Sequence, residues 1–152
     1  MKPPAGIKGG VLARILAGPW CGQLLADLGA EVVKVERPGA GDDTRHWGPP
    51  FLHDANGNDR DAAYYHAANR GKTARFIDIA TPEGQAEVRA LVADADVVIE
   101  NYKVGGLVKY GLDHASLLSV NPRLITCSIT RFRRTRPYAH RAGYDFIIQG
   151  VG

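Results

Sequence analysis

Residues 11–36 of the chain read VLARILAGPWCGQLLADLGAEVVKVE, and the fold class can be inferred from the order of elements in this segment. Val11 to Leu16 is a short apolar run that predicts a strand. After a Gly-Pro turn, Trp20 to Leu28 carries apolar residues at helical spacing, and Gly29 is placed to end that helix as its C-cap. The β-branched run Glu31 to Val35 predicts the next strand. Strand, helix and strand in this order form a βαβ unit, which indicates a parallel sheet.

The rest of the chain alternates between strand-like and helix-like segments. Residues 36–60 are rich in Pro, Gly, Asp and Asn without periodicity, which predicts a long loop of the kind that carries function. Thr81-Pro82-Glu83 is a typical helix start, with a capping threonine, a proline in the first turn and an acid at the positive end of the helix. The other predicted segments are a short helix at 62–68, strands at 74–79, 96–100 and 124–129, and helical pieces at 107–110 and 115–118.

We therefore predict a single amino-terminal α/β domain over residues 1–152. Its expected fold class is Rossmann-like and doubly wound, with a mainly parallel sheet and helices on both faces. In such a fold, ligands meet the loops at the carboxyl ends of the strands.

Composition and charge narrow the function classes. The chain of 152 residues has 45% hydrophobic and 23% charged residues, which argues against a disordered or fibrous protein. No stretch approaches the roughly 18 apolar residues that span a bilayer, and the first residues lack the apolar region of a signal peptide. We therefore expect a cytoplasmic protein with no membrane partner. Cys21 and Cys127 are interpreted as reduced, buried thiols rather than zinc ligands.

The basic residues are concentrated locally. The formal net charge is +3, and four arginines gather within residues 131–136. Such a cluster indicates an anionic partner. Because no aromatic interleaving or recognised nucleic-acid motif accompanies it, a phosphorylated cofactor fits better than nucleic acid.

Four loop segments beside predicted strands carry residues suited to an anionic ligand. They are Leu16 to Trp20, Lys34 to Arg45, Asn69 to Lys72, and Glu100 to Tyr102. The first offers small residues at a helix amino end, where backbone N–H groups favour anions. Taken singly, each can also be an ordinary tight turn or a solvated loop whose charges pair among themselves. Because all four flank strands of one predicted sheet, we predict that they meet in one pocket.

Together, these segments resemble a known family. The run Leu16 to Trp20, followed by Leu28 to Pro38, resembles the class III CoA-transferases, the CaiB/BaiF family with its formyl-CoA transferases. The pattern is most similar to succinyl-CoA:dicarboxylate CoA-transferases and extends in the family's order over nearly the whole chain. The further matching segments are 41–45, 69–72, 96–102, 109–111, 121–123 and 142–145.

The resemblance implies an enzyme that moves CoA from an acyl-CoA donor to a small carboxylic acid through an aspartate nucleophile. The aspartate would attack the thioester to give a mixed anhydride and CoA thiolate. The thiolate would then form an aspartyl-CoA thioester, which the acceptor acid resolves. CoA or acyl-CoA is thus expected as a substrate, without a metal or redox cofactor. The loop from Gly39 to Pro50 suggests succinyl-CoA as donor, and the family's interlocked rings imply a homodimer.

Carried onto matching positions, the family's CoA contacts fall on chemically suitable residues. Arginine and lysine can neutralise the 3′-phosphate and the diphosphate, while Ala17 and the backbone near it can lie against the adenine. The implied CoA-binding residues are Leu16, Ala17, Arg37, Asn69, Arg70, Gly71, Lys72, Asn101, Tyr102, Lys103, Lys109, Arg141, Ala142, Gly143, Tyr144 and Asp145. No catalytic residue and no metal ligand is predicted within the chain.

The chain departs from the family pattern in three places. The family's nucleophilic aspartate lies beyond residue 152, and Asp145 looks like a cofactor-side or structural residue instead. Gly9 and Gly10 replace two aliphatic residues, which weakens the first strand. Three arginines within residues 131–136 stand where the family typically has glycine, at a cost of about 1 kcal/mol or more wherever positive φ is needed.

These departures lead to expectations for the isolated chain. We expect a portion, truncated before the family's later segments, that holds CoA but is inactive alone, more like a remnant or a fragment than a tuned enzyme. Uncovered apolar surface would favour self-association. One alternative is a non-catalytic module that binds CoA or another nucleotide or serves in assembly. Another is an acyl-CoA racemase relative, which is disfavoured because it would need a histidine where Tyr144 stands.

Overall fold

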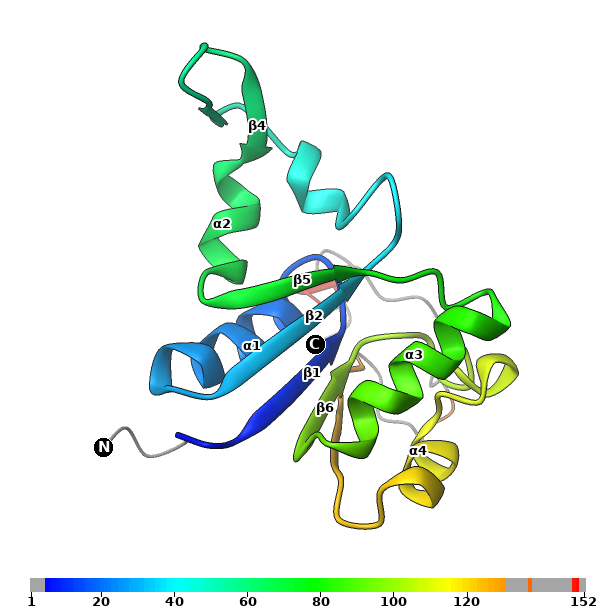
Figure 1. Ribbon diagram of the computed structural model, residues 1–152. Helices are drawn as coiled ribbons and strands as arrows, with labels where there is room; N and C mark the ends of the chain where they lie inside the picture. The colour runs from blue at the N-terminus through cyan, green and yellow to red at the C-terminus, as the bar shows by residue number, and fades with distance from the viewer. Residues whose placement is uncertain (1–4, 131–136, 138–148, 151–152) are drawn as a thin grey trace.

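The fold was derived from a computed structural model that describes residues 5–130, residue 137 and residues 149–150. Five strands form the central sheet: β1 (Lys8–Leu12), β2 (Glu31–Glu36), β5 (Lys72–Phe76), β6 (Val97–Glu100) and β7 (Ile125–Ser128). Their spatial order is β5-β2-β1-β6-β7, and every neighbouring pair is parallel (Figure 1). Along the chain this is the order third, second, first, fourth, fifth, as in doubly wound folds. The predicted Rossmann-like α/β class is confirmed.

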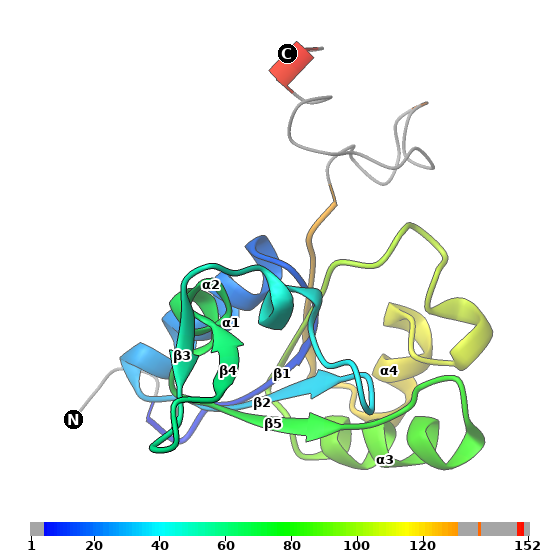
Figure 2. The same ribbon diagram turned by 90° about the horizontal axis from the view of Figure 1, so that it is seen from above.

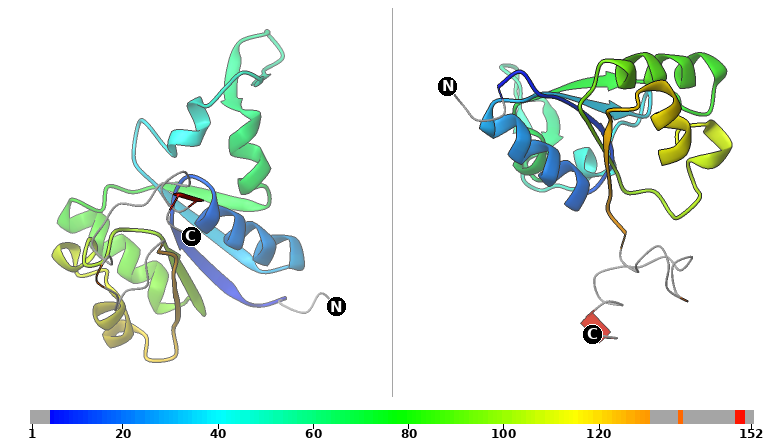
Figure 3. Two further views of the ribbon diagram at one scale, coloured as in Figure 1. Left: turned by 180° about the vertical axis from the view of Figure 1, so that it is seen from behind. Right: turned by 90° about the horizontal axis from the view of Figure 1, so that it is seen from below.

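Helices lie on both faces of the sheet. Helix α1 (Ala17–Leu28) packs on β1, β2 and β6, with α2 (Ala63–Asn69) beside it. Helices α3 (Pro82–Ala93) and α4 (His114–Val120) pack against each other and share a core with the other face. Figures 2 and 3 show α1 and α3 on opposite sides of the sheet.

Each face has its own core because successive side chains of a strand point to opposite faces. Val11 and Ile99 belong to the cluster under α1, whereas their neighbours Leu12 and Val98 belong to the cluster under α3 and α4. All four are at most 4% exposed. The central strands β1 and β6 are therefore buried on both sides.

Strand β1 begins earlier than predicted. It spans Lys8–Leu12, so residues 13–16 form the turn that leads into α1. Gly9 and Gly10 do not break the strand, because backbone hydrogen bonding needs no side chain and β1 pairs with β2 on one side and β6 on the other. The prediction of a strand over 11–16 was wrong in its bounds because apolar character alone does not separate a buried strand from a buried turn.

The long segment after β2 contains short elements that periodicity did not reveal. A single 3₁₀ turn, η1 (Asp43–His46), is followed by β3 (Phe51–His53) and β4 (Asp59–Ala62), which form an antiparallel hairpin. Figure 1 shows the hairpin standing away from the sheet, above α2. A second 3₁₀ turn, η2 (Val108–Tyr110), precedes α4.

The helix boundaries follow the predicted local signals. The Thr81 hydroxyl accepts a hydrogen bond from the Gly84 N–H at 3.1 Å, and so caps α3. Gly29 ends α1 with φ of 112°, a left-handed conformation that glycine adopts without steric cost. No helix within the described ranges is long and apolar enough to cross a membrane.

Candidate functional site

The loops after β1, β2 and β6 leave the same, carboxyl edge of the sheet. In the sheet, β1 lies between β2 and β6. The chain passes from β1 to β2 on one side of β1, and its later strand β6 lies on the other side. This makes the position between the β1 and β6 loops a topological switch point, where doubly wound proteins bind ligands. The structure therefore places the candidate site around residues 13–18, 37–42 and 101–103.

Leu16 and Ala17 lie at the amino end of α1, as predicted. Leu16 precedes the helix, and no side chain caps this end. Gly18 is required here, because a Cβ atom at this position would lie 2.3 Å from the Cβ of Ala13. The first N–H groups of a helix have no partner inside it, and the helix dipole adds partial positive charge. The start of α1 therefore suits an anionic group.

Asn101 joins the β6 loop to the β1 turn. Its side-chain amide donates to the Arg14 carbonyl at 2.7 Å, and its oxygen accepts the Arg14 N–H at 3.1 Å. The side chain therefore fixes the turn across the switch point. Its predicted contact with CoA stays a prediction.

Tyr102 and Lys103 line a hollow of about 230 Å³ at the same end of β6, on the α4 side. Burial raises the pKa of Tyr102 above its ordinary value, so its hydroxyl stays neutral and can donate a hydrogen bond. Lys103 is exposed and brings a positive charge to the rim. The hollow thus combines an apolar wall with polar groups suited to an elongated, partly anionic ligand.

Arg37 follows β2 directly and is exposed. Among the residues that the structure describes, it forms no ion pair, so its charge is available to a ligand at this edge. Lys109 lies on η2, with its amine 4.7 Å from the centre of the Tyr110 ring. The predicted residues Arg141 to Asp145, and the arginine cluster of residues 131–136, lie outside the described residues.

The backbone of the segment Asn69 to Lys72 lies at the opposite edge of the sheet from Arg37 and Asn101. It precedes β5, whose first residue Lys72 pairs with Val32, so its backbone lies at the amino edge of the sheet. The Lys72 side chain nevertheless extends to the first turn of α1, where its amine donates a hydrogen bond to the Pro19 carbonyl. The predicted convergence of this segment with the other loops therefore stays a prediction. Contact between this segment and CoA stays a prediction.

Side chains of this segment attach it to α1 and α2. The Lys72 amine donates to the carbonyls of Pro19 and Ala68 and to the Asn69 side chain, at 2.5–2.9 Å. Burial, followed by repulsion from Lys34, lowers the pKa of Lys72 to about 7. Arg70 forms an ion pair with Asp27 at 2.7 Å. Gly71 adopts φ of 75°, in the region that glycine tolerates.

A buried charge network lies beneath the carboxyl edge. The Lys34 ammonium is 2.5 Å from Asp42 and 3.9 Å from Glu36, and the three side chains are at most 1% exposed. Glu36 also accepts hydrogen bonds from Arg45 at 2.7 and 3.0 Å and from the Tyr65 hydroxyl at 2.7 Å. These contacts join β2 to η1 and α2, and they fix the segment that follows Arg37.

The two acids of this network are held ionised. Burial opposes the charge of Asp42, but hydrogen bonds from Lys34 and Thr44 outweigh it and keep its pKa below the ordinary value. For Glu36, burial is likewise outweighed by Arg45, Tyr65 and Lys34, so its pKa is also lowered. Both carboxylates are therefore charged and accept hydrogen bonds from the cationic and hydroxyl groups around them.

Sequence reasoning allowed the charges of Lys34 to Arg45 to pair among themselves in a solvated loop, but it missed that they are buried, although a signal for this exists. In the strand Glu31–Glu36, the alternation that buries Val32 also directs Lys34 and Glu36 to the same face. Charged side chains at buried positions need partners of opposite charge. The acids and the arginine in residues 41–45 were the available partners.

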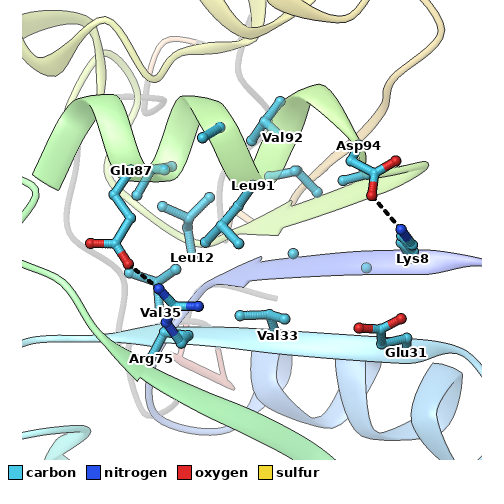
Figure 4. A pocket seen from close by; sticks show the side chains of 16 residues that line it. Lys8, Leu12, Glu31, Val33, Val35, Arg75, Glu87, Leu91, Val92 and Asp94 are labelled. Atoms are coloured by element: carbon cyan, nitrogen blue, oxygen red, sulfur yellow. Dashed lines mark hydrogen bonds and ion pairs between the residues drawn. The ribbon is translucent and has the colours of Figure 1, made fainter.

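A second hollow, of about 320 Å³, lies between the sheet and α3 (Figure 4). Its walls are mainly apolar, and Gly9 and Gly10 contribute no side chains to it. Its rim carries the ion pairs Lys8–Asp94 and Arg75–Glu87 (Figure 4). Because these cations are already paired and Lys8 lies at the amino edge, the hollow does not suit the phosphates of a cofactor.

The fold and the carboxyl edge define a class of protein. It is a doubly wound α/β protein whose switch point offers a helix amino end and cationic side chains to a phosphorylated ligand. The residues of the described segments contain no group of three or more His, Cys, Asp or Glu side chains that could hold a metal ion.

Comparison with known proteins identifies the family. The profile described as CoA-transferase family III matches residues 6–152, and the chain belongs to this family. It is 62% identical over 151 residues to a succinate–glutarate CoA-transferase of Agrobacterium fabrum, and 46% identical over 151 residues to a succinyl-CoA:glutarate CoA-transferase of Mus musculus. The resemblance seen in the sequence is confirmed.

A solved structure supports the same assignment. The crystal structure of a CaiB/BaiF family protein from Brucella suis matches with a TM-score of 0.94 and 62% identity, over 99% of this chain and 39% of that one. The two transferases are each matched over 99% of this chain, but over 38% and 33% of their own length. The chain thus spans little more than a third of its relatives.

Proposed function

We propose that the protein transfers CoA from an acyl-CoA donor to a carboxylic acid, and that this chain supplies the amino-terminal part of the CoA site. The observation that carries the proposal is the carboxyl edge, where Arg37, Lys103 and the start of α1 offer positive charge beside the switch point. Family membership and the high identity to CoA-transferases support it. These relatives favour neither a racemase nor a purely non-catalytic module.

The residues at this edge suit different parts of CoA. Arg37, Lys103 and the N–H groups at the start of α1 can neutralise phosphates. Ala17, which is exposed, can lie against the adenine, as the family resemblance implies. The Tyr102 hydroxyl can donate a hydrogen bond within the adjacent hollow of about 230 Å³.

Three acids of the segment that follows β2 into η1 are poor candidates for the nucleophile. An attacking carboxylate needs an oxygen that can approach a thioester carbonyl. Glu36 and Asp42 are buried and fully engaged in the charge network, and Asp43 pairs with Arg14 at 3.3 Å. We propose that these acids support the site and that another part of the protein supplies the attacking aspartate.

The proposed substrates are dicarboxylic. The names of both related transferases pair succinate or succinyl-CoA with glutarate. We propose succinyl-CoA as donor and a dicarboxylate of glutarate's size as acceptor, in a cytoplasmic homodimer.

Calorimetric titration of the chain with CoA tests the binding part of the proposal. We expect measurable heat at CoA concentrations up to the millimolar range. Arg37→Ala should weaken binding about tenfold, and the effect should shrink at high salt because the lost interaction is ionic. Arg123→Ala is the matched control, since Arg123 is exposed near the start of β7, at the opposite edge. Absence of heat at millimolar CoA, or equal losses in both variants, would contradict the proposal.

A transfer assay tests the chemistry. The complete protein, incubated with succinyl-CoA and glutarate, should form glutaryl-CoA and succinate. The 152-residue chain alone should bind CoA without forming product. Turnover by the purified chain alone would show that one of its own carboxylates attacks the thioester, and would contradict the proposal that another part of the protein supplies the attacking aspartate.

A further inference from the structure

Ile15, in the turn between β1 and α1, has an unfavourable backbone conformation. Its φ is 71°, and it is the only non-glycine residue with positive φ in the described part of the chain. A β-branched side chain is rarely found there, because it crowds the neighbouring carbonyl. Such a conformation persists only where surrounding contacts impose it, and it is often found at functional sites.

The Asp42 side chain contacts the Ile15 backbone directly. Both of its carboxylate oxygens accept the Ile15 N–H, at 3.2 and 3.3 Å. The carboxylate is itself held by the Lys34 ammonium at 2.5 Å and by the N–H and hydroxyl of Thr44 at 3.0 and 2.7 Å. The Asp42 side chain is 0% exposed, so water cannot replace these partners.

The turn is also held from the other side of the switch point. Asn101 bonds both the N–H and the carbonyl of Arg14, the residue before Ile15. The β1 turn is therefore fixed between the loop that follows β2 and the loop that follows β6. One residue after Ile15, Leu16 begins the uncapped end of α1.

We infer that Asp42, anchored by Lys34, is a positioning residue of the CoA site: it holds Ile15 in the left-handed conformation and so directs the start of α1 toward the ligand. The inference rests on the proposed function, because the start of α1 matters only if CoA binds there. It assigns Asp42 no contact with the ligand.

The test separates positioning of the turn from a general effect on stability. Glycine adopts positive φ without steric cost, so Ile15→Gly should remove the need for Asp42. We compare the wild-type chain, Asp42→Asn, the double variant Ile15→Gly/Asp42→Asn, and Thr81→Ala as a remote control. Thr81 caps α3, so its loss should lower stability without reaching the turn. Each form is measured for CoA affinity by calorimetry, for hydrogen exchange at the residue 15 amide, and for stability by urea unfolding.

The expected pattern is specific. Asp42→Asn should weaken CoA binding about tenfold or more, since small displacements of a binding group have large effects. It should also speed exchange of the residue 15 amide. The double variant should recover CoA affinity to within about threefold of wild type. Thr81→Ala should keep wild-type affinity despite its lower stability.

Two results would overturn the inference. One is a folded Asp42→Asn variant that binds CoA as tightly as wild type. The other is a double variant that binds no better than Asp42→Asn. If Asp42→Asn alone does not fold, folding and CoA binding by the double variant support the inference. If neither variant folds, the inference is overturned, because the essential role of Asp42 would then be to neutralise the buried Lys34 ammonium and not to hold the turn. A wild-type chain that binds no CoA would overturn the proposed function as well.

Discussion

Lys34 organises the buried charge of this molecule. It lies on a central part of β2 at 1% exposure, with Asp42 and Glu36 as its two anionic neighbours. Taking charges out of water is costly, and the cost is offset only when each charge keeps its partners. The network is therefore stable only as long as each of its buried charges keeps an oppositely charged partner, so the loss of one member affects the others.

Removing Lys34 should be strongly destabilising. We expect Lys34→Met to lower the free energy of unfolding by about 3–5 kcal/mol, because two buried carboxylates lose their shared cation. Lys109→Met is the control, since it removes an exposed lysine whose amine lies 4.7 Å from the centre of the Tyr110 ring, and it should cost less than about 1 kcal/mol. Urea unfolding followed by circular dichroism measures both. A loss of less than about 1 kcal/mol in both variants would show that the buried Asp42 and Glu36 carboxylates do not need the Lys34 charge.

The same acids should make the fold sensitive to acid. The pKa values of Asp42 and Glu36 are lowered from ordinary values of 3.8 and 4.5, so below that range the unfolded chain binds more protons than the folded chain. Their contribution to stability is complete above pH 4.5 and is lost as the pH falls through their folded values. Urea unfolding between about pH 5 and pH 3 should therefore show a steeper loss for wild type than for Asp42→Asn. Parallel pH profiles would contradict this expectation.

At the scale of elements, β1 is held by its neighbours rather than by its own side chains. Gly9 and Gly10 contribute no apolar side chains, yet both pair with β2 and β6. The space that Gly10 leaves is part of the hollow under α3, whereas Gly9 faces Val32 and Leu25 on the α1 side. Strand β1 is thus fully hydrogen-bonded to its neighbours, but its side facing α3 is incompletely packed.

Filling that space should stabilise the protein. A Cβ atom at Gly10 would lie 3.3 Å from a methyl group of Val98, which borders the hollow and so has room to move. We expect Gly10→Ala to raise the free energy of unfolding by about 0.5–1 kcal/mol, because alanine loses less backbone entropy on folding. Gly18→Ala provides the contrast: its Cβ would lie 2.3 Å from that of Ala13, and it should lower stability by about 1–3 kcal/mol. Thermal unfolding of both variants checks the sign, and destabilisation by Gly10→Ala would show that Val98 cannot move.

At the scale of the whole molecule, one side of α1 is apolar and uncovered. Trp20, Leu24 and Leu28 are 59%, 58% and 43% exposed. Their spacing of four residues places them in one stripe along the helix. Contiguous apolar surface of this kind favours association.

We predict that the isolated chain self-associates through this stripe. Replacing Trp20 and Leu24 together by lysine should lower the sedimentation-average mass measured at fixed concentration, because charge opposes burial of the stripe. Val108→Lys is the control, since Val108 is 60% exposed but lies on η2. An unchanged mass in the double variant, or an equal decrease with Val108→Lys, would place the association elsewhere.

Much of the fold was predictable because its signals are local. The cap at Thr81, the glycine at the end of α1 and the β-branched run in β2 each specify an element from a few neighbouring residues. The candidate site was predictable only in part. Leu16, Ala17, Arg37 and the residues from Asn101 to Lys103 lie at the carboxyl edge of the sheet. The backbone of Asn69 to Lys72 lies at the amino edge, because this segment precedes its strand, and the Lys72 side chain extends from there to the first turn of α1.

The alternation of strands and helices and the parallel sheet follow from periodicity in the sequence, and the family follows from the similarity of its motifs. Which charges are buried together depends on the packing of the elements and became visible in the structure alone. Lys34, Asp42 and Ile15 are separated along the chain, and their contacts depend on how β2, η1 and the β1 turn pack. A charge enclosed by packing must find its partners in three dimensions, and a strained backbone is held only by neighbours that packing brings to it.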